Sequence, residues 1–157
     1  MKLFKNNQKG FTLIELLVVI GILAVLLAIT LIAINPARQF AQANNTKRRS
    51  DVNAILNAVN QYMADNKGVL PSGITTTAQN ISDTAANICT ALVPTYIAAL
   101  PADPQINSGL GVGAAISDCA QIGGYDTGYT IVQSADNNRI TVTAPTVELS
   151  DPVSVTR

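Results

Sequence analysis

The dominant pattern in the sequence is an unbroken apolar stretch from Phe11 to Ile34, in which Glu15 is the single charged residue. As a helix, this stretch would be about 36 Å long, enough to cross a bilayer core of about 30 Å. Its apolar residues surround the helix axis instead of forming one stripe. The pattern predicts a membrane-spanning helix. A buried core helix is the first alternative, but the remaining chain is too small and too polar to enclose it.

A secretory signal peptide is the second alternative for the apolar stretch. The apolar core of such a signal has about 7–15 residues and ends at a small-x-small cleavage site. The stretch is longer than that, and the small-x-small match at Ala41-Gln42-Ala43 lies within a helical pattern. We therefore favour the membrane-spanning interpretation.

A second helical pattern follows over residues 37–66. Pro36 is expected to kink or loosen the helix where the apolar stretch ends. Residues 37–51 are nearly all polar or Ala, and this part is expected to project into solvent or to lie between copies of the chain. Asn66-Lys67-Gly68 is a typical helix stop. Apolar residues recur at helical spacing on one face, at Val52, Ile55, Leu56, Val59 and Met63.

Residues 69–157 are rich in Thr, Ala, Asn, Gly and Asp and are expected to form a small body. In the strand expected at 139–143, Ile140 and Val142 alternate with Thr141 and Thr143, so one face of the strand can pack on the helix. The fold class predicted is α+β: a long N-terminal helix, its apolar half exposed in the monomer, packed against a small antiparallel sheet of three or four strands. The expected elements are a short helix at 82–92, strands at 129–133 and 139–143, and further strands at 147–149 and 153–155.

Charge is segregated along the chain, although ten Lys and Arg balance ten Asp and Glu. Residues 1–50 carry seven basic groups and one acid, a net charge of +6, whereas residues 51–157 carry three basic groups and nine acids, a net charge of −6. This asymmetry suggests a membrane-facing end, or copies that pack basic part against acidic part.

Composition excludes several classes of enzyme and binding protein. Without His, the chain has no Ser-His-Asp triad, Cys-His dyad or His-ligated zinc, and two Cys cannot build a four-thiolate site. Zero net charge is not typical of a bulk nucleic-acid binder. The dinucleotide-like match at 109–114 follows a Pro-containing loop and is expected to be a flexible loop. We therefore do not expect an enzyme.

The segment Lys9-Gly10-Phe11-Thr12-Leu13-Ile14-Glu15-Leu16 resembles the processing motif of type IV pilins and pseudopilins. The resemblance implies that residues 1–10 are a leader cut off between Gly10 and Phe11 by a membrane peptidase. It also implies that Phe11 is then N-methylated and that Glu15 is the hallmark acid of the family. Charge counting leaves the orientation open, whereas the resemblance implies a cytoplasmic leader and an external body.

Physical chemistry gives Glu15 a role in assembly. Cleavage would create an ammonium group at Phe11, which Glu15 of a neighbouring copy could neutralise only at one axial offset. Breaking a buried charge pair typically costs about 3–5 kcal/mol. Glu15 is therefore expected to set the register of a filament. Pro36 remains the expected kink, since only Gly21 weakens the helix within the apolar stretch.

Cys89 and Cys119 are expected to form a disulfide if the body lies outside the membrane. Such a bond could contribute roughly 3–4 kcal/mol; two free buried thiols are the alternative. Asp103, Asp118 and Asp126 are candidate calcium ligands by resemblance to pseudopilins, although their spacing is not that of an EF-hand. No other cofactor is expected.

The basic cluster Lys47-Arg48-Arg49 admits several interpretations. It is expected to be a solvated face, to pair with acidic bodies of neighbouring copies, or to contact anionic headgroups. Three adjacent bases are weak evidence for nucleic-acid binding.

The function expected is that of a pilin that polymerises into an extracellular type IV pilus. The resemblance implies as partners further copies of the chain, the prepilin peptidase and methylase, a platform protein and an assembly ATPase. The precursor would be held in the cytoplasmic membrane. The alternatives are a pseudopilin of a secretion or competence machine and a single-span anchored binding module. The expected segments are a leader (1–10), a membrane or filament-core helix (11–34), an amphipathic continuation (35–68) and a body (69–157).

Overall fold

The computed structural model describes residues 10–157. Of the predicted leader, residues 1–9 lie outside the described residues. The chain divides into two compact units, one that ends at Gln39 and one that runs from Phe40 to Arg157.

The first unit contains helix α1, Leu13–Ile34. Its Leu, Ile, Val and Ala side chains are compatible with a helix, and no Pro interrupts the backbone hydrogen bonds. None of its 22 residues is buried, and its large apolar side chains are 50–83% exposed. The helix is long and apolar enough to cross a membrane. The predicted exposure of the apolar half in the monomer is therefore confirmed.

Helix α2, Pro36–Asp65, begins with Pro36 at a position where the missing N–H removes no intrahelical hydrogen bond. The helix ends in a turn in which Lys67 has φ +56° and the Gly68 N–H donates to the Met63 carbonyl at 2.8 Å. This turn is the stop expected at Asn66-Lys67-Gly68. The predicted apolar stripe is fully buried at Val52, Ile55, Leu56 and Val59, with Met63 packed at its edge.

The polar half of α2 departs from the expectation that residues 37–51 face solvent or other copies. Asn45, Arg48 and Asp51 are 2%, 0% and 9% exposed. Their three-residue spacing places them on one helix face, where loops of the same body cover them. The Asn45 amide, for example, donates to the carbonyl of Glu148, which lies 103 residues further along the chain.

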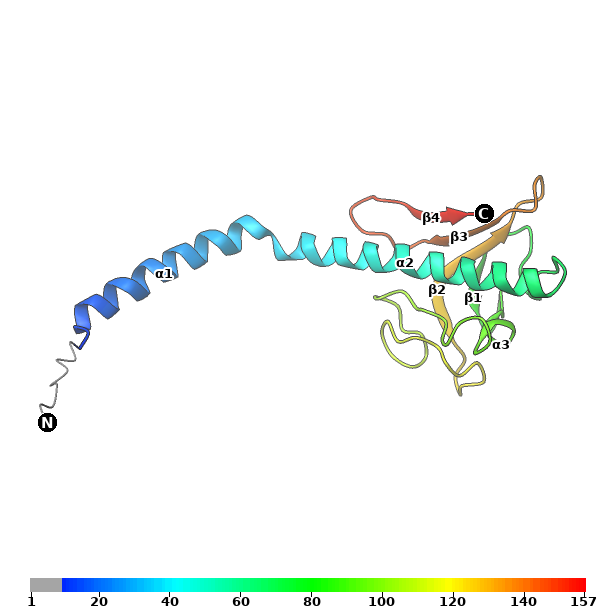
Figure 1. Cartoon of the computed structure of the whole chain (residues 1–157), viewed down its shortest axis with the longest axis horizontal. Coiled ribbons are helices and arrows are strands. Elements are labelled where there is room, and N and C mark those ends of the chain that lie inside the picture. The colour runs from blue at the N-terminus through cyan, green and yellow to red at the C-terminus, as the bar shows by residue number, and fades with distance from the viewer. Residues whose placement is uncertain (1–9) are drawn as a thin grey trace, which may run out of the picture. The chain divides into compact units, whose positions relative to one another are not determined.

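The body contains one antiparallel sheet with the strand order β1-β2-β3-β4. Thr130 pairs with Thr143 between β2 and β3, and Thr143 pairs with Ser154 between β3 and β4. Figure 1 shows the sheet beside α2. The antiparallel sheet and its place in an α+β fold confirm the predicted fold class. The strands are β1 (Gln79–Ser82), β2 (Asp126–Gln133), β3 (Ile140–Ala144) and β4 (Val153–Thr156).

The core of the body lies between α2 and the inner face of the sheet. On β3, Ile140 and Val142 are buried while Thr141 and Thr143 are only partly buried, as the alternation predicts. Between β1 and β2, the long connection adds fully buried side chains that supplement a sheet with few large apolar residues. These residues are Ala86, Ile88, Cys89, Leu92, Leu100, Ala102 and Ile116.

Two local predictions were wrong. The helix expected over 82–92 is reduced to α3, Cys89–Leu92, because Ser82 ends β1 and the Asp83 N–H bonds to the Tyr125 carbonyl. The strand expected at 147–149 is a turn, because its backbone bonds to α2 instead of to another strand: the Glu148 N–H donates to the Asn45 side chain at 3.1 Å.

Candidate functional site

The segment before α1 is open and non-helical. Nothing lies within 4 Å of the position where a Cβ would stand on Gly10, and Phe11 is 90% exposed. Thr12 has extended backbone angles, φ −81° and ψ 152°. The Gly10–Phe11 bond therefore lies two residues before the helix, in accessible backbone of the kind that proteases cut.

Thr12 and Glu15 form a capping box at the start of α1. The Glu15 N–H donates to Thr12 Oγ1 at 3.2 Å. In return, Glu15 Oε2 accepts from the Thr12 backbone N–H at 2.8 Å and from the Thr12 hydroxyl at 2.7 Å. These contacts satisfy backbone donors that a helix start otherwise leaves unpaired. Glu15 thus has a partner within its own chain.

Asn35 forms the junction between the two helices. It has φ +46° and is the C-cap of α1, while its carbonyl accepts from the Arg38 N–H at 3.1 Å and so starts α2. Pro36 follows it directly. The break in helical geometry thus occurs at Asn35, one residue before the Pro36 at which the sequence predicted a kink.

The segment around this site is similar to segments of known proteins. A family model described as the prokaryotic N-terminal methylation motif matches residues 5–31. The chain is 33% identical over 88 residues to the type IV wide pilus major component PilA4 of Thermus thermophilus. Both matches support the resemblance of this chain to the type IV pilin family. The predicted resemblance is thereby confirmed.

The similarity to PilA4 is partial. It covers 56% of this chain and 66% of the relative, so the chain spans just under two thirds of that protein's length. No solved structure matches the chain. The methylation motif and the apolar α1 fit membrane anchoring and a place on the cell surface.

In the body, Arg48 is the centre of a buried polar cluster. Its Nε donates to Asp103 Oδ2 at 2.7 Å, and Nη2 donates to Asp103 Oδ1 at 3.1 Å and to Gln105 Oε1 at 2.9 Å. Nη1 donates to Asn45 Oδ1 and Glu148 Oε2, both at 3.0 Å. All five donors of the guanidinium are therefore used. The cluster joins α2 to two loops distant in the sequence.

The charges of this cluster are held in their ionised forms. The hydrogen bond to Asp103 raises the pKa of Arg48 further, against the effect of burial. Burial raises the pKa of Asp103, but hydrogen bonds from Arg48, Thr146 and the Gln105 N–H together outweigh it and hold that pKa below its ordinary value. The buried ion pair is thus fully hydrogen-bonded, which is the condition for burying charge in a protein.

A second polar contact lies one turn further along α2. The Tyr129 hydroxyl and Lys47 Nζ both donate to Asp51 Oδ2 at 2.8 Å, and Lys47 also donates to the Ala102 carbonyl at 2.7 Å. Burial and the bond to Asp51 raise the pKa of Tyr129. The tyrosine therefore remains a donor and ties β2 to α2.

The three side chains of the basic cluster Lys47-Arg48-Arg49 all form ion pairs within the body. Lys47 pairs with Asp51, Arg48 is fully buried, and Arg49 pairs with Asp151. The structure therefore gives no support to the hypotheses that these residues contact nucleic acid, headgroups or neighbouring copies.

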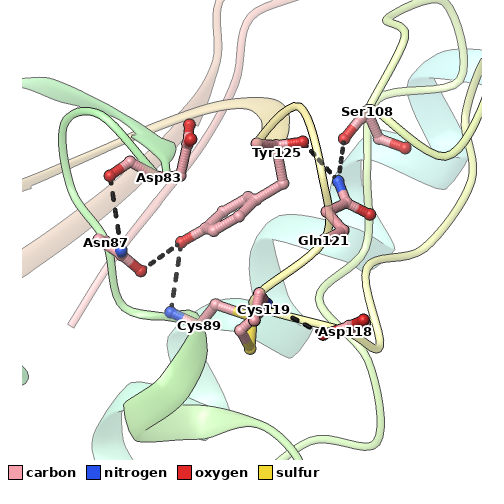
Figure 2. The surroundings of a disulfide bond; sticks show 10 residues. Asp83, Asn87, Cys89, Ser108, Asp118, Cys119, Gln121 and Tyr125 are labelled. Carbon is pink, nitrogen blue, oxygen red and sulfur yellow. Dashed lines mark hydrogen bonds between the residues drawn. A yellow bond between two sulfur atoms is a disulfide. The ribbon is translucent and has the colours of Figure 1, made fainter.

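Cys89 and Cys119 are joined by a disulfide, with their Cα atoms 5.6 Å apart. Figure 2 shows Tyr125 beside it: the Tyr125 hydroxyl accepts from the Cys89 N–H at 3.4 Å and donates to Asn87 Oδ1 at 3.0 Å. The bond ties α3 to the loop that precedes β2.

Gln121 organises the adjoining loops (Figure 2). Its Nε2 donates to the carbonyls of Ser108 at 3.2 Å and Gly124 at 2.6 Å. Gly124 has φ +76°, which favours glycine, and a Cβ there would stand 2.1 Å from an Asp83 oxygen, so a larger residue would strain the backbone and displace the Asp83 carboxylate.

The three candidate calcium ligands are not brought together. Asp103 is bound to Arg48 and Thr146, Asp118 accepts from the Ala120 N–H and Asp126 accepts from the Gly128 N–H. Within residues 10–157, no group of three or more Cys, Asp or Glu residues is arranged to hold a metal ion.

Sequence reasoning missed the Arg48–Asp103–Glu148 cluster. One signal was present: Asn45, Arg48 and Asp51 recur every three residues, in line with the apolar stripe that begins at Val52. Polar residues that continue an apolar stripe indicate a buried hydrogen-bonded face. The identity of their partners depended on two loops whose folds the sequence did not reveal.

Proposed function

We propose that this pilin is a structural subunit, without enzymatic activity, that polymerises into an extracellular type IV pilus after its leader is removed. The observation that carries the proposal is the surface of α1, where a 22-residue apolar helix has no buried residue. Exposed apolar area of this extent requires a cover of lipid or of other apolar helices. A helical filament of identical copies supplies the second kind of cover.

Processing would occur at the open backbone before α1. A membrane peptidase would cut between Gly10 and Phe11, and a methylase would then act on the new amino group of Phe11. Before assembly, α1 would span the cytoplasmic membrane with the leader in the cytoplasm and the body outside. Extraction into the filament would use a platform protein and an assembly ATPase.

Register along the filament would be set by charge. Between Gly10 and Ile34 the only charged side chain is Glu15, and cleavage adds one ammonium at Phe11. Pairing of Glu15 in one copy with Phe11 of the next would leave no buried charge without a counterpart. A shifted register would lose that pair, at a cost of about 3–5 kcal/mol.

The Thermus relative is a major component of a wide pilus, and this similarity favours a fibre-forming pilin over a pseudopilin or an anchored binding module. Since the body already employs Lys47, Arg48 and Arg49 internally, we do not propose a role in nucleic-acid binding.

The proposal is tested by blocking cleavage. In Gly10→Leu, the leader should remain attached and sheared surface fibres should disappear in electron micrographs. The matched control is Gly21→Ala, since Gly21 lies within α1 and away from the cleavage site, and its leader should be removed as in the parent chain. Mass spectrometry of fibre protein should find an N-terminus at methylated Phe11. Fibres built from a chain that starts at Met1 would refute the proposal.

Glu15→Ala tests the register. Cleavage at Gly10 should be retained, whereas fibre yield should fall strongly because the Phe11 ammonium loses its counterpart. Parental fibre yield in this variant would remove Glu15 from the assembly mechanism and leave the rest of the proposal intact.

A further inference from the structure

The four-stranded sheet has two edges, and the chain covers them unequally. At the β1 edge, the turn that follows the strand closes back on it, and the Asn80 carbonyl accepts from the Ala86 N–H at 2.9 Å. Strand β4 forms the other edge and lies at the outer margin of the body (Figure 1). The β4 edge is therefore the one to which a further strand can be added.

The pairing of β4 with β3 decides which backbone groups of β4 point outward. Arg157 and Ile140 exchange two backbone hydrogen bonds, at 2.7 and 2.9 Å. Because the bonds of an antiparallel ladder alternate along a strand, Ser154 and Thr156 turn their N–H and C=O groups away from β3. Among residues 10–157, these four groups have no hydrogen-bond partner. The edge thus offers two free donors and two free acceptors.

Strand β4 lacks most of the features that prevent an edge from pairing further. Protected edges usually carry a charge, an internal Pro or a bulge. Val153–Thr156 contains no charge and no Pro, and its register with β3 is continuous. Only its length of four residues limits it. An edge of this kind binds an extended strand through main-chain hydrogen bonds.

The edge is complementary to itself. An antiparallel register that places Ser154 opposite Thr156 of a second copy bonds all four outward groups of each copy. Val155, which is partly buried against the core, then lies opposite Val155 of the second copy and is covered further. Arg157, the one charged residue in 153–157, lies opposite Val153. No like-charged side chains therefore meet directly across the contact.

Two further features favour this register. The hydroxyl oxygens of Thr143 and Ser154 are 3.0 Å apart on one face of the sheet, and Thr156 of the second copy continues this hydroxyl row, because residues directly opposite each other share a face. Sliding the strands by one pair would place Pro152 opposite Thr156. Since Pro has no N–H, the Thr156 carbonyl would then lose its donor.

We propose that the β4 edge is a surface for lateral association of filaments, which adds β4 of a copy in a neighbouring filament as an antiparallel strand. The contact is isologous, so it needs a two-fold axis between the two copies. Copies within one polar filament are related by rotation and rise about its axis and cannot face each other in this way. The partner therefore belongs to another filament, a step that rests on the proposed function.

A single contact of this kind is weak. Pairing of two four-residue strands buries far less than the roughly 1,200 Å² of a stable interface. A filament repeats the contact wherever its bodies face the neighbouring filament, and repeated contacts act together. Fibres should therefore form bundles, whereas the unassembled chain should be mainly monomeric.

The fibre test uses charges placed on the edge. In Ser154→Lys with Thr156→Lys, each introduced lysine lies opposite a lysine of the second copy, which is unfavourable. In Ser154→Lys with Thr156→Glu, opposite charges meet instead. In electron micrographs, the fraction of fibres in bundles should fall at least about tenfold in the first variant, because the repulsion recurs along the fibre. The second variant should keep its bundles.

A charge control excludes a general repulsion between fibres. Thr76→Lys with Thr77→Lys adds the same net charge at exposed positions before β1 and should leave the bundles in place. Near-ultraviolet circular dichroism of the unassembled chains checks that all variants fold alike.

Cross-linking of the unassembled full chain in mild detergent tests the pairing itself. Where antiparallel strands exchange no backbone hydrogen bond, opposite Cα atoms are about 4.5 Å apart, within reach of a disulfide. Val155→Cys should therefore give a covalent dimer on oxidation. Thr141→Cys is the matched control, since Thr141 is partly buried like Val155 but lies on β3, one strand in from the edge. It should remain a monomer.

The outcomes distinguish this inference from the proposed function. Parent fibres that stay separate, or bundles that survive the two lysines at the edge, would overturn lateral association and leave the pilin function intact. No dimer from Val155→Cys, the result expected if β4 instead received a strand of a different protein, would overturn self-pairing, as would equal dimer from Thr141→Cys. A parent chain without fibres would refute the pilin function, while the cross-link still decides whether β4 edges pair.

Discussion

Helix α1 and the body differ in which side chains they expose and which they bury. In α1, large apolar side chains are 50–83% exposed and nothing is buried. In the body, the side chains of Arg48 and Asp103 are 0% exposed, and every N–H donor of Arg48 is hydrogen-bonded. Helix α1 thus exposes apolar side chains and the body buries charged ones, which is the reverse of the usual arrangement in a soluble domain.

The contrast indicates where each region finds its partners. Arg48 finds its partners within the body, so its energetics are those of a folded domain. The side chains of α1 find none in their own chain, so their energetics depend on lipid or on further copies. The same kind of substitution should therefore affect folding in one region and assembly in the other.

Removing the buried cation should have the largest effect. Arg48→Ala leaves Asp103 buried without its charge partner and should lower the free energy of unfolding of the body by about 3–5 kcal/mol. All four tyrosines lie between Tyr62 and Tyr129. Near-ultraviolet circular dichroism of the full chain in mild detergent therefore follows unfolding of the body alone.

Arg49→Ala is the control for this prediction. Its ion pair with Asp151 is about half exposed on both sides, so its loss should change stability by no more than about 1 kcal/mol. Equal effects of the two substitutions would show that burial of Arg48 does not distinguish it from a surface arginine.

Loss of the disulfide should have the next largest effect. Replacing Cys89 and Cys119 by Ser opens a link across 30 residues and should lower the stability of the body by about 3–4 kcal/mol. The helical content of α1 should not change. Circular dichroism in detergent measures both the stability of the body and the helical content of α1. A loss of α1 helicity would contradict the separation of the two regions.

Acid should weaken the body before it affects α1. Burial raises the pKa of Asp103, but hydrogen bonds from Arg48, Thr146 and the Gln105 N–H outweigh it and hold that pKa below its ordinary value. This carboxylate therefore stabilises the body above its unfolded pKa of about 3.9, and the contribution is lost as the pH falls through the lower pKa of the folded state.

Thermal unfolding of the body in detergent between about pH 5 and pH 2 should show this loss. The double variant Arg48→Met, Asp103→Leu should have a flatter pH profile, because the titrating pair is gone. A parallel decline in parent and double variant would place the acid sensitivity elsewhere.

A matched pair of conservative substitutions should show the smallest effect. Ile55 is fully buried and Ile22 is 56% exposed. Ile55→Val should destabilise the body by about 0.5–1.5 kcal/mol through the lost methylene, whereas Ile22→Val should leave tyrosine-detected unfolding unchanged. A measurable shift from Ile22→Val would mean that α1 contributes to the stability of the body.

Periodicity predicted the helices and most of the sheet. The stripe from Val52 to Val59 and the alternation around Ile140 depend on local spacing, which the sequence displays directly. The strand Gln79–Ser82 was missed because it has four residues and one fully apolar side chain, Ile81. It therefore shows no alternation of apolar and polar residues. Its existence depends on pairing with β2, which lies far along the chain.

The two sites differed in how far they could be predicted. Gly10, Phe11 and Glu15 lie close together in the sequence, so a local motif could identify them, and the capping box itself follows from Thr12 and Glu15 at the required spacing. The partners of Arg48 lie 55 and 100 residues away. Contacts of that separation are set by loop conformation, for which spacing along the chain gives no rule.

The junction at Asn35 has a mechanical consequence. Pro36 lacks an N–H, and Asn35 has left-handed backbone angles, so the regular backbone hydrogen bonding of α1 does not continue into α2. A fibre under tension would therefore be expected to lengthen first at this junction, while the disulfide-linked body resists. Stretching single fibres in an optical trap should then give reversible extension, with the tyrosine environments unaltered.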